Sequence, residues 1–416
     1  MHSPSHPLRL ATAGSVDDGK STLIGRLLHD TGSVPADELA AIERASLRRG
    51  LPEPDLALLT DGLRAEREQG ITIDVAYRYF TTRRRFVLAD TPGHVQYTRN
   101  MVTGASTAEV VVILVDARKA LAEQARRHAA ISALLRVPRI LLAVNKMDLV
   151  DWSESRFASV VAEFTAHAAS LGVSGTAAIP LSALTGDNVV TPSARMDWYQ
   201  GPTLLSCLET VQTDPEPGHG PARLPVQYVI RTGTAADRRH AYAGQLLSGT
   251  LRVGEPVTVL PAGHRTSISA IDLLGTPVDT ATAPQSVAIS LADELHVSRG
   301  DLIAPTAAAL PTPTRNIRAT VCQLHDRPLR TGDRILVKHT TRTVRATIGP
   351  ISARTDGLSG AVHGESGRLA VNDIGTVLLR TAEALAPDPY AESRRTGALL
   401  LIDPTDGATL AAGLVE

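Results

Sequence analysis

The residues at positions 14–21 have the types and spacing of a loop that binds phosphate groups. They read Gly14-Ser15-Val16-Asp17-Asp18-Gly19-Lys20-Ser21 and are followed by Thr22. This order fits the pattern G-x-x-x-x-G-K-[ST], in which glycines let backbone N–H groups curl around an anion. Lys20 can reach the β- and γ-phosphates of a nucleoside triphosphate, and the Ser21 hydroxyl can ligate Mg²⁺. An ordinary glycine-rich turn is the alternative, but an apolar run before the loop and a helical pattern after it favour a nucleotide site.

Two segments downstream can complete a site for Mg²⁺ and the γ-phosphate. Thr72, in the stretch 70–74, can close over the γ-phosphate and ligate Mg²⁺, or it can be a plain β-edge threonine. The apolar run 86–90 ends at Asp90, which can hold Mg²⁺ through water from the carboxyl end of a strand. The next residues are Thr91, Pro92, Gly93 and His94. The glycine can present its N–H to the γ-phosphate, whereas a simple chain reversal is the less favoured alternative.

Two further elements can recognise a base. Asn145-Lys146-Met147-Asp148 directly follows the apolar run 139–144. The Asp148 carboxylate can accept the N1–H and the exocyclic NH₂ of guanine together, a donor pair that adenine lacks. Asn145 would brace this loop, and the Lys146 stem would lie over the base. Ser182, Ala183 and Leu184 follow a later strand and can offer backbone N–H groups to the guanine O6. GTP with Mg²⁺ is therefore the expected ligand.

Each of these motifs follows an apolar run that reads as a strand, and the runs alternate with helical patterns. The expected strands are 8–13, 86–90, 110–115, 139–144 and 177–181, and the expected helices are 22–29, 121–136, 153–171 and 203–211. Residues 31–60 are polar and rich in charges. The alternation predicts the α/β class, with a doubly wound, mostly parallel sheet and the nucleotide at its carboxyl edge.

Stretches rich in proline and glycine divide the chain. We predict a P-loop GTPase domain at 1–213, a linker at 214–223, and two β-barrel domains at 224–305 and 312–416. A second linker is expected at 305–313. The expected strands of the two barrels are 225–230, 243–247, 256–259, 267–271 and 286–291, then 316–322, 334–339, 343–348, 370–380 and 398–402.

Three basic clusters stand outside these motifs. Residues 83–85 predict a solvated hairpin turn. Residues 126–128 and 238–240 predict solvated faces, with contact to a partner as the minor alternative. None of the three clusters has the spacing of a metal-binding motif.

The overall composition limits the classes of function. The chain has 416 residues, a formal net charge of −1, a pI near 6.9 and 3% aromatic residues. The net charge gives no support for a protein that coats nucleic acid, although a local basic face stays open, and the few aromatic residues disfavour stacking on single strands. No nucleic acid partner is therefore expected. The N-terminus has no apolar signal core, no run reaches the length of a membrane span, and the two cysteines suggest no disulfide framework. A cytoplasmic protein without a membrane partner is expected.

The motifs together resemble those of translation-factor-type GTPases, and the predicted barrels resemble domains two and three of elongation factor Tu. The chain is more similar still to the GTPase (large) subunit of bacterial sulfate adenylyltransferase. Besides the phosphate loop, this resemblance rests on residues 59–80, 96–101, 103–106, 225–228, 338–345, 369–375 and 388–392. It therefore covers essentially the whole chain.

The resemblance implies a GTPase that drives ATP and sulfate to adenylyl sulfate and pyrophosphate. It implies that a separate small adenylyltransferase subunit carries out the adenylyl transfer, in a heterodimer or larger assembly. It assigns catalytic roles to His94, which orients the attacking water, to Lys20, which holds phosphate, and to Thr72. It also implies that Ser21, Thr72 and Asp90 form the Mg²⁺ site.

Other implications concern the surroundings of His94. Analogy with elongation factor Tu implies that Val16 and Ile71 form an apolar gate, which keeps His94 out until a partner signals. Val95 departs from the glutamate that is usual at this position in relatives. No second phosphate loop is present, so adenylyl-sulfate kinase activity is not expected. A translation-type GTPase that delivers an RNA or acts on the ribosome is the alternative, although residues 60–80 and the near-neutral charge favour the sulfate branch.

Overall fold

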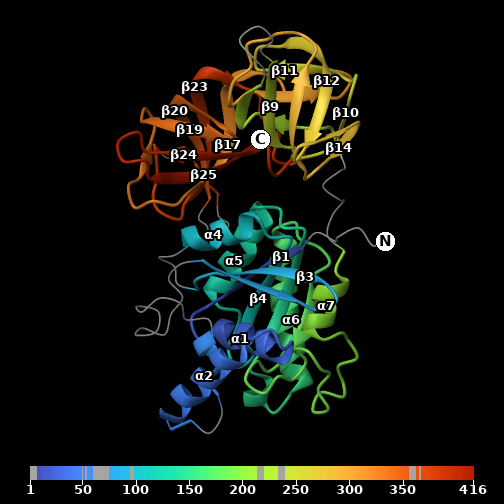
Figure 1. Cartoon of the computed structure of the whole chain (residues 1–416). Coiled ribbons are helices and arrows are strands. Elements are labelled where there is room, and N and C mark those ends of the chain that lie inside the picture. The colour runs from blue at the N-terminus through green and yellow to red at the C-terminus, as the bar shows by residue number, and fades with distance from the viewer. Residues whose placement is uncertain are drawn as a thin grey trace. The chain divides into compact units, whose positions relative to one another are not determined.

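The structure is a computed structural model, and it describes residues 7–48, 50–51, 54–59, 75–93, 98–212, 220–232, 239–355, 362–364 and 367–416. The chain divides into two compact units, residues 1–214 and 215–416, and each is described by itself. Figure 1 draws the first unit in blue to green and the second in yellow-green to red. Within the described residues, no helix is long and apolar enough to cross a membrane. The domain boundaries expected from the sequence stay predictions.

The first unit is built on a six-stranded sheet with the order β2-β3-β1-β4-β5-β6. Its strands are β1 (Leu8–Gly14), β2 (Ala76–Thr81), β3 (Arg85–Asp90), β4 (Val110–Asp116), β5 (Arg139–Asn145) and β6 (Ala177–Pro180). Its helices are α1 (Lys20–Asp30), α2 (Ala36–Arg48), α4 (Thr98–Ser106), α5 (Glu123–Leu134), α6 (Glu154–Ser170) and α7 (Leu204–Thr210), with the 3-10 helices η1 (Leu56–Leu59) and η3 (Met147–Val150). All pairings are parallel except that of β2 with β3, so the predicted doubly wound α/β fold is confirmed.

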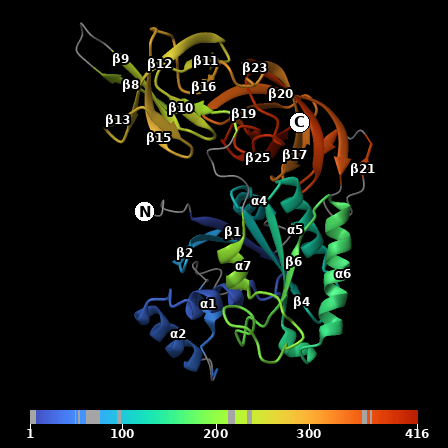
Figure 2. The same cartoon turned by 90° about the vertical axis from the view of Figure 1, so that its right-hand side faces the viewer.

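The central strands are buried because helices cover both faces of the sheet. Every residue of β4 is buried, and its sequence VVVILVD is the uninterrupted apolar run that a strand covered on both faces requires. One core cluster joins side chains of α1 and α7 to alternate residues of β1 and β4, including Leu10 and Val112. Figure 2 shows α1 and α7 on one side of the sheet and α6 on the other.

The stretch expected to be merely polar, 31–60, contains α2 and η1. Pro35 directly precedes the helix, and Asp37 and Glu38 lie in its first turn, where carboxylates complement the helix dipole. Only two residues of α2 are buried, among them Ile42, which belongs to a small cluster with two leucines of η1. Because its apolar face is so narrow, periodicity alone did not predict the helix.

The basic cluster 83–85 forms the predicted turn. Strands β2 and β3 pair antiparallel, with Thr81 opposite Arg85, and the Thr82 N–H donates to the Arg84 carbonyl at 2.9 Å. Arg83 and Arg85 are exposed. The hairpin prediction is therefore confirmed.

The second unit contains two strand systems. The first has the order β7-β16-β11-β12-β15-β9-β8, with β13 beside β12 and a separate ribbon of β10 and β14. Its strands are β7 (Leu224–Pro225), β8 (Tyr228–Thr232), β9 (Arg239–Gln245), β10 (Thr250–Arg252), β11 (Pro256–Leu260), β12 (His264–Leu273), β13 (Thr276–Val278), β14 (Thr280–Thr282), β15 (Ser286–Leu291) and β16 (Leu302–Pro305). Side chains from both the sheet and the ribbon, such as Ile289 and Leu251, share one core.

The second strand system closes on itself. Its order is β19-β24-β25-β17-β23-β20-β21, and β19 also pairs with β20. Its strands are β17 (Thr314–Gln323), β19 (Arg334–His339), β20 (Arg342–Thr355), β21 (Val362–His363), β23 (Ile374–Leu385), β24 (Ala398–Ile402) and β25 (Thr409–Val415). Strands β18 (Leu329–Arg330) and β22 (Arg368–Leu369) form a separate two-stranded ribbon. Strand β25 was not expected, because its alanines and glycine have low strand propensity, yet it completes the barrel between β17 and β24.

A buried ion pair ties the two strand systems together. Arg223, at the end of the predicted linker, is 2% exposed and donates to both carboxylate oxygens of Asp388, through Nη2 at 2.9 Å and Nε at 3.0 Å. Asp388 also accepts the Thr396 hydroxyl at 2.6 Å, and Arg223 Nη2 donates to the Ala309 carbonyl at 2.7 Å. A buried charge is tolerated only when it is paired in this way. Both predicted linkers therefore contribute to a packed junction.

Candidate nucleotide-binding site

The sheet brings the predicted motifs to one edge. In the register of the parallel strands, Thr12 of β1 lies beside Asp90 of β3, and Asp116 of β4 lies beside Asn145 of β5. The loops that follow these strands therefore leave from adjacent positions at the carboxyl edge. In doubly wound sheets, ligands bind outside that edge, at the point where the connections from two neighbouring strands go to opposite faces of the sheet. The predicted placement of the nucleotide fits this architecture.

The phosphate loop is held by its own side chains. Gly19 caps α1 with φ 91°, a left-handed conformation that glycine adopts without strain, and a Cβ there would meet Asn145. The Ser15 N–H donates to the Asp18 carboxylate at 2.7 Å. Burial raises the pKa of Asp18, and the hydrogen bond from Ser15 opposes that shift. The Asp18 carboxylate therefore helps to shape the loop.

Lys20 lies inside this loop. Its side chain is 7% exposed, and its Nζ donates to the Gly14 carbonyl at 3.0 Å and to the Ser15 carbonyl at 2.8 Å. Burial lowers the pKa of the Lys20 ammonium, whereas the neighbouring carboxylates, Asp90 first, raise it. Ser21 and Thr22 follow in the first turn of α1, and both are half-buried. A cation and a hydroxyl therefore stand together at the start of the helix.

The segment after β3 approaches the loop closely. The Thr12 hydroxyl donates to Asp90 at 3.2 Å, and the Thr91 hydroxyl donates to the Thr12 carbonyl at 2.5 Å. A Cβ on Gly93 would lie 2.6 Å from the Gly14 carbonyl and also against Lys20, so only glycine fits there. Pro92 is buried beside it. The predicted residues Thr72 and His94 lie outside the described residues.

Asn145 joins the motif loops to one another. Its Nδ2 donates to the Asp18 carbonyl at 2.7 Å, and its Oδ1 accepts the Ala183 N–H at 2.9 Å. One fully buried amide side chain therefore connects the phosphate loop with the loop at 182–184. The role of Asn145 in nucleotide binding stays a prediction.

The neighbours of Asn145 occupy distinct positions. Lys146 has φ 64°, and its Nζ donates to the Asp17 carbonyl in the phosphate loop. Met147 is fully buried and anchors the turn through a 3.3 Å bond from its N–H to the Leu181 carbonyl. Asp148 is half-buried beside it. Val16, proposed for an apolar gate, is half-buried as well.

The third predicted loop is held by a residue that the sequence did not indicate. Ser182 and Ala183 are buried, whereas Leu184 is 61% exposed. Arg26 of α1 donates through Nε to the Ala183 carbonyl at 3.3 Å and through Nη2 to the Leu184 carbonyl. A basic residue six positions after Lys20 carried no visible signal, since its partners lie more than 150 positions away.

The residues present fit a bound GTP. Among the residues that the structure describes, none hydrogen-bonds the buried Ser15 hydroxyl, which leaves this polar group of the loop for a ligand. The described residues hold no cluster of three or more His, Cys, Asp or Glu side chains suited to a metal ion. Ser21, in the first turn of α1, supplies a hydroxyl of the kind that ligates Mg²⁺ in phosphate-loop enzymes.

Comparisons with known proteins agree with these features. Residues 6–217 match the Elongation factor Tu GTP binding domain, and residues 316–416 match the GTP-eEF1A C-terminal domain-like family. The chain is 52% identical to the Bifunctional enzyme CysN/CysC of Mycobacterium tuberculosis, over 98% of this chain and 67% of that protein. It is 48% identical to Sulfate adenylyltransferase subunit 1 of Methylorubrum populi, over 100% of this chain and 88% of that protein. The chain belongs to the sulfate adenylyltransferase subunit 1 family.

Other relatives agree with this assignment. Sulfate adenylyltransferase subunit 1 of Aeromonas hydrophila is 45% identical, over 100% of this chain and 87% of that protein. Among solved structures, the chain is similar to Sup35 complexed with GDP, with a TM-score of 0.44 and 22% identity over 99% of this chain and 93% of that chain. That last likeness is too low to bear on the site. The resemblance drawn from the motifs is confirmed.

In this sulfate adenylyltransferase subunit 1 family member, one basic cluster departs from expectation. The prediction of a solvated face at 126–128 is wrong for two of its residues, because Arg127 is 6% exposed and His128 is 3% exposed. They lie one helical turn before Ile131 and Ser132, which are also buried. Arg127 Nε and Nη1 and His128 Nδ1 are buried without hydrogen-bond partners in the described part of the chain. The third cluster, 238–240, lies partly outside the described residues.

Burial of His128 has a consequence for stability at low pH. Burial, with nearby Lys20 and Arg127, lowers the pKa of His128 from 6.5 to about 3. Below pH 6.5 the unfolded chain takes up a proton that the folded chain excludes, so stability falls as the pH drops from 6.5 toward 3. We expect His128→Leu to remove this dependence of the unfolding free energy on pH, which amounts to about 1.4 kcal/mol per pH unit between pH 6.5 and 3.

Urea unfolding, followed by tryptophan fluorescence at several pH values, measures how the unfolding free energy depends on pH. The two tryptophans of the chain, Trp152 and Trp198, both lie in the first unit, so their emission reports on it. The difference in unfolding free energy between wild type and His128→Leu should change steadily from pH 6.5 downward. A difference that stays constant with pH would show that His128 does not titrate on unfolding.

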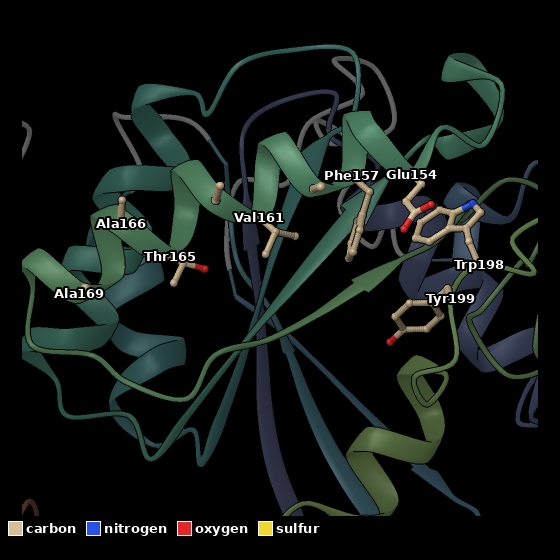
Figure 3. A pocket seen from close by; sticks show the side chains of 10 residues that line it. Glu154, Phe157, Val161, Thr165, Ala166, Ala169, Trp198 and Tyr199 are labelled. Carbon is tan, nitrogen blue, oxygen red and sulfur yellow. The ribbon is translucent and has the colours of Figure 1, made fainter.

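A pocket of the first unit lies apart from the predicted site residues. It has a volume of about 640 Å³ and is lined by the outer face of α6, with Phe157 and Val161, and by Trp198 and Tyr199. Figure 3 shows these aromatic side chains at one end of the helix. Burial raises the pKa of Tyr199 to about 12, so its hydroxyl stays protonated at neutral pH. No phosphate-loop or base-loop residue lines this pocket.

Proposed function

We propose that this chain binds GTP with Mg²⁺ and hydrolyses it as the larger subunit of a sulfate adenylyltransferase. The hydrolysis drives the conversion of ATP and sulfate to adenylyl sulfate and pyrophosphate, which a separate small adenylyltransferase subunit carries out. Coupling meets a thermodynamic need, since a sulfate–phosphate anhydride lies uphill of ATP. The proposal includes a cytoplasmic location, where both nucleotides are supplied.

The observation that carries the proposal is the buried bridge through Asn145. It connects the phosphate loop with the loop at 182–184 in a chain 48% identical to Sulfate adenylyltransferase subunit 1 of Methylorubrum populi. A phosphate site and a base site at a fixed separation are what a nucleotide requires. The name "subunit 1" supports a partner subunit. The alternative of a translation-type GTPase gains no support from these relatives.

The roles at the phosphate end follow from position and charge. Gly14, Gly19 and Lys20 hold the phosphates through backbone N–H groups and a cation. Ser21, Thr72 and Asp90 hold Mg²⁺, Asp90 through water, and the ion when bound neutralises charge on the β- and γ-phosphate oxygens. The remaining loop residues, 15–18 and 91–93, shape the cradle around these groups.

The other residues of the proposed site act on the attacking water and on the guanine base. His94 orients the attacking water, which makes hydrolysis depend on how the segment after Gly93 is held. Asp148 accepts two hydrogen bonds from guanine, Lys146 lies over the base, and residues 182–184 offer N–H groups to O6. Thr72 and His94 enter this proposal from the sequence, because both lie outside the described residues.

Measurement of GTP hydrolysis with each component omitted in turn tests the coupling. We expect weak phosphate release by this chain alone, and a rise of at least about tenfold when the small subunit, ATP and sulfate are all present, equal to about 1.4 kcal/mol off the barrier. His94→Ala should lose most of that rise while GTP binding persists, because the histidine acts on water. Adenylyl sulfate formation is measured in the same reactions.

The controls separate the two candidate functions. Omission of sulfate alone, of ATP alone or of the small subunit alone should each return hydrolysis to the basal rate. Ribosomes, added in place of the small subunit, should not stimulate it. If ribosomes stimulate hydrolysis and the complete sulfate mixture does not, the chain is a translation-type GTPase and the proposal is wrong.

A further inference from the structure

Asp116 ends strand β4 beside the base-recognition loop. It lies opposite Asn145 in the sheet register, and its side chain is fully buried. No motif in the sequence includes Asp116, and the nucleotide roles described above do not use it. A carboxylate buried at this edge of the sheet needs cationic or hydrogen-bonding partners, because their interactions offset the free-energy cost of removing its charge from water.

Two cations meet Asp116. Arg118 donates from Nη2 at 2.7 Å and from Nε at 3.0 Å, and its backbone N–H donates to the same carboxylate at 3.0 Å. Lys146 Nζ lies 3.1 Å from the second carboxylate oxygen. Burial by itself would raise the pKa of Asp116, but the bonds from Arg118 and Lys146 outweigh it and hold the pKa well below its usual range. The group is therefore an anion throughout the neutral pH range.

Lys146 is consequently held at its tip by two elements. Its Nζ donates to the Asp17 carbonyl in the phosphate loop and pairs with Asp116 at the end of β4. Its backbone has φ 64°, a left-handed conformation that is costly for residues other than glycine, asparagine and aspartate. Only strong anchoring keeps a long, flexible lysine stem in one position, because fixing it costs rotamer entropy.

The turn that carries Arg118 is itself braced. Arg156, in the first turns of α6, donates to the Ala117 carbonyl at 2.5 Å and to the Lys119 carbonyl at 2.7 Å. The Ala117 N–H donates to the Asn145 carbonyl at 2.8 Å. The Arg118 side chain is 45% exposed, so its contacts with Asp116, rather than burial, fix its place. The turn thus connects the end of β4 to both the base loop and α6.

We propose that Asp116 is a positioning residue for the nucleotide base, which acts by fixing Lys146, and that Arg118 holds Asp116 in place. The inference rests on the proposed binding of guanine nucleotides. The lysine stem contacts the plane of the base and not its hydrogen-bonding edge, so the effect of Asp116 is the same for di- and triphosphates. It is also independent of recognition by Asp148.

Dissociation of fluorescent mant-GDP and mant-GppNHp from the full chain tests this role. Asp116→Asn keeps the shape but removes the charge, and we expect both ligands to leave at least about tenfold faster. Arg118→Ala should speed release about threefold or more, and Arg118→Lys should recover part of the loss. Arg126→Ala is the matched control, because it breaks an arginine–carboxylate pair of α5, with Glu163 at 2.5 Å, that does not touch Lys146. Its release rates should equal those of wild type.

Two further readouts distinguish positioning from damage to the fold. The affinity ratio of GDP to IDP, which lacks the 2-amino group, should stay at the wild-type value in Asp116→Asn, since only the Asp148 contact reads that group. In a Lys146→Ala background, Asp116→Asn should add little, because the residue through which it acts is already gone. Tryptophan fluorescence checks that each variant is folded, and Arg118→Ala decides the matter if Asp116→Asn is not.

Each contrary result has a distinct meaning. Unchanged release from both Asp116→Asn and Arg118→Ala overturns the inference, and so does an Asp116→Asn effect that persists in full without Lys146. A changed GDP-to-IDP ratio would place Asp116 at the base edge instead, which also overturns it. Failure of wild type to bind mant-GDP at all would refute the proposed function, a result separable from the others because no variant is involved.

Discussion

Replacement of Lys20 by alanine is expected to abolish GTP hydrolysis and to weaken GTP binding by roughly 10- to 150-fold. The ammonium supplies a charge-assisted contact to the phosphates, worth about 1.5–3 kcal/mol. The fold should survive, because other hydrogen bonds hold the loop besides those that Lys20 donates. Asp18 accepts the Ser15 N–H, and Asn145 binds the Asp18 carbonyl. Calorimetry gives the affinity, and phosphate release gives the rate.

A second lysine supplies the control. Lys338 is exposed on β19 in the second unit, and Lys338→Ala removes the same charge from the chain without touching the phosphate loop. It should bind and hydrolyse GTP as wild type does. Circular dichroism and tryptophan emission should be unchanged in both variants. A folded Lys20→Ala chain that hydrolyses GTP normally would show that residues 14–21 are not a nucleotide loop.

Replacement of Asp148 by asparagine is expected to change the preferred base from guanine to xanthine. The carboxylate accepts two hydrogen bonds from guanine, whereas an asparagine amide can donate to the 2-oxo group of xanthine instead. Loss of a bond to a charged group costs about 1.5–3 kcal/mol, so GTP affinity should fall by roughly 10- to 150-fold while XTP affinity rises. Competition calorimetry with both nucleotides measures the change.

The matched control for this change lies three residues away. Asp151 is exposed at the end of η3 with φ 51°, a conformation that asparagine tolerates well. Asp151→Asn should therefore keep both the fold and the preference for GTP. Equal GTP affinity in wild type and Asp148→Asn would contradict the assignment of the base-recognition loop.

The strands that carry the site could be read from the sequence because burial on both faces leaves a local signature. Residues 110–115 are an uninterrupted apolar run, and the structure places them in β4, with every residue buried. Strands β1 and β5 are buried except for Arg9 and Arg139, and four of the six residues of β3 are buried. The phosphate loop and the base loop follow such strands directly, so their types and order were visible without any coordinates.

Contacts between distant residues left no such signature. Arg26 holds the carbonyls of Ala183 and Leu184 across 157 and 158 positions, and Arg223 pairs with Asp388 across 165. An arginine with a distant partner looks the same in the sequence as a solvated one. The cluster 126–128 shows the converse error, since the sequence predicted Arg127 and His128 to be solvated but both are buried.

By itself, the sequence determined the α/β class and the family, because these follow from local periodicity and short motifs. Only the tertiary structure decided how the residues of the candidate site are held. Asn145 spans two loops, and Asp116 anchors Lys146 to the end of the neighbouring strand. The physical reason is that strand register brings together groups that are far apart along the chain. Their mutual distances, and hence their charges and hydrogen bonds, exist only once the sheet has formed.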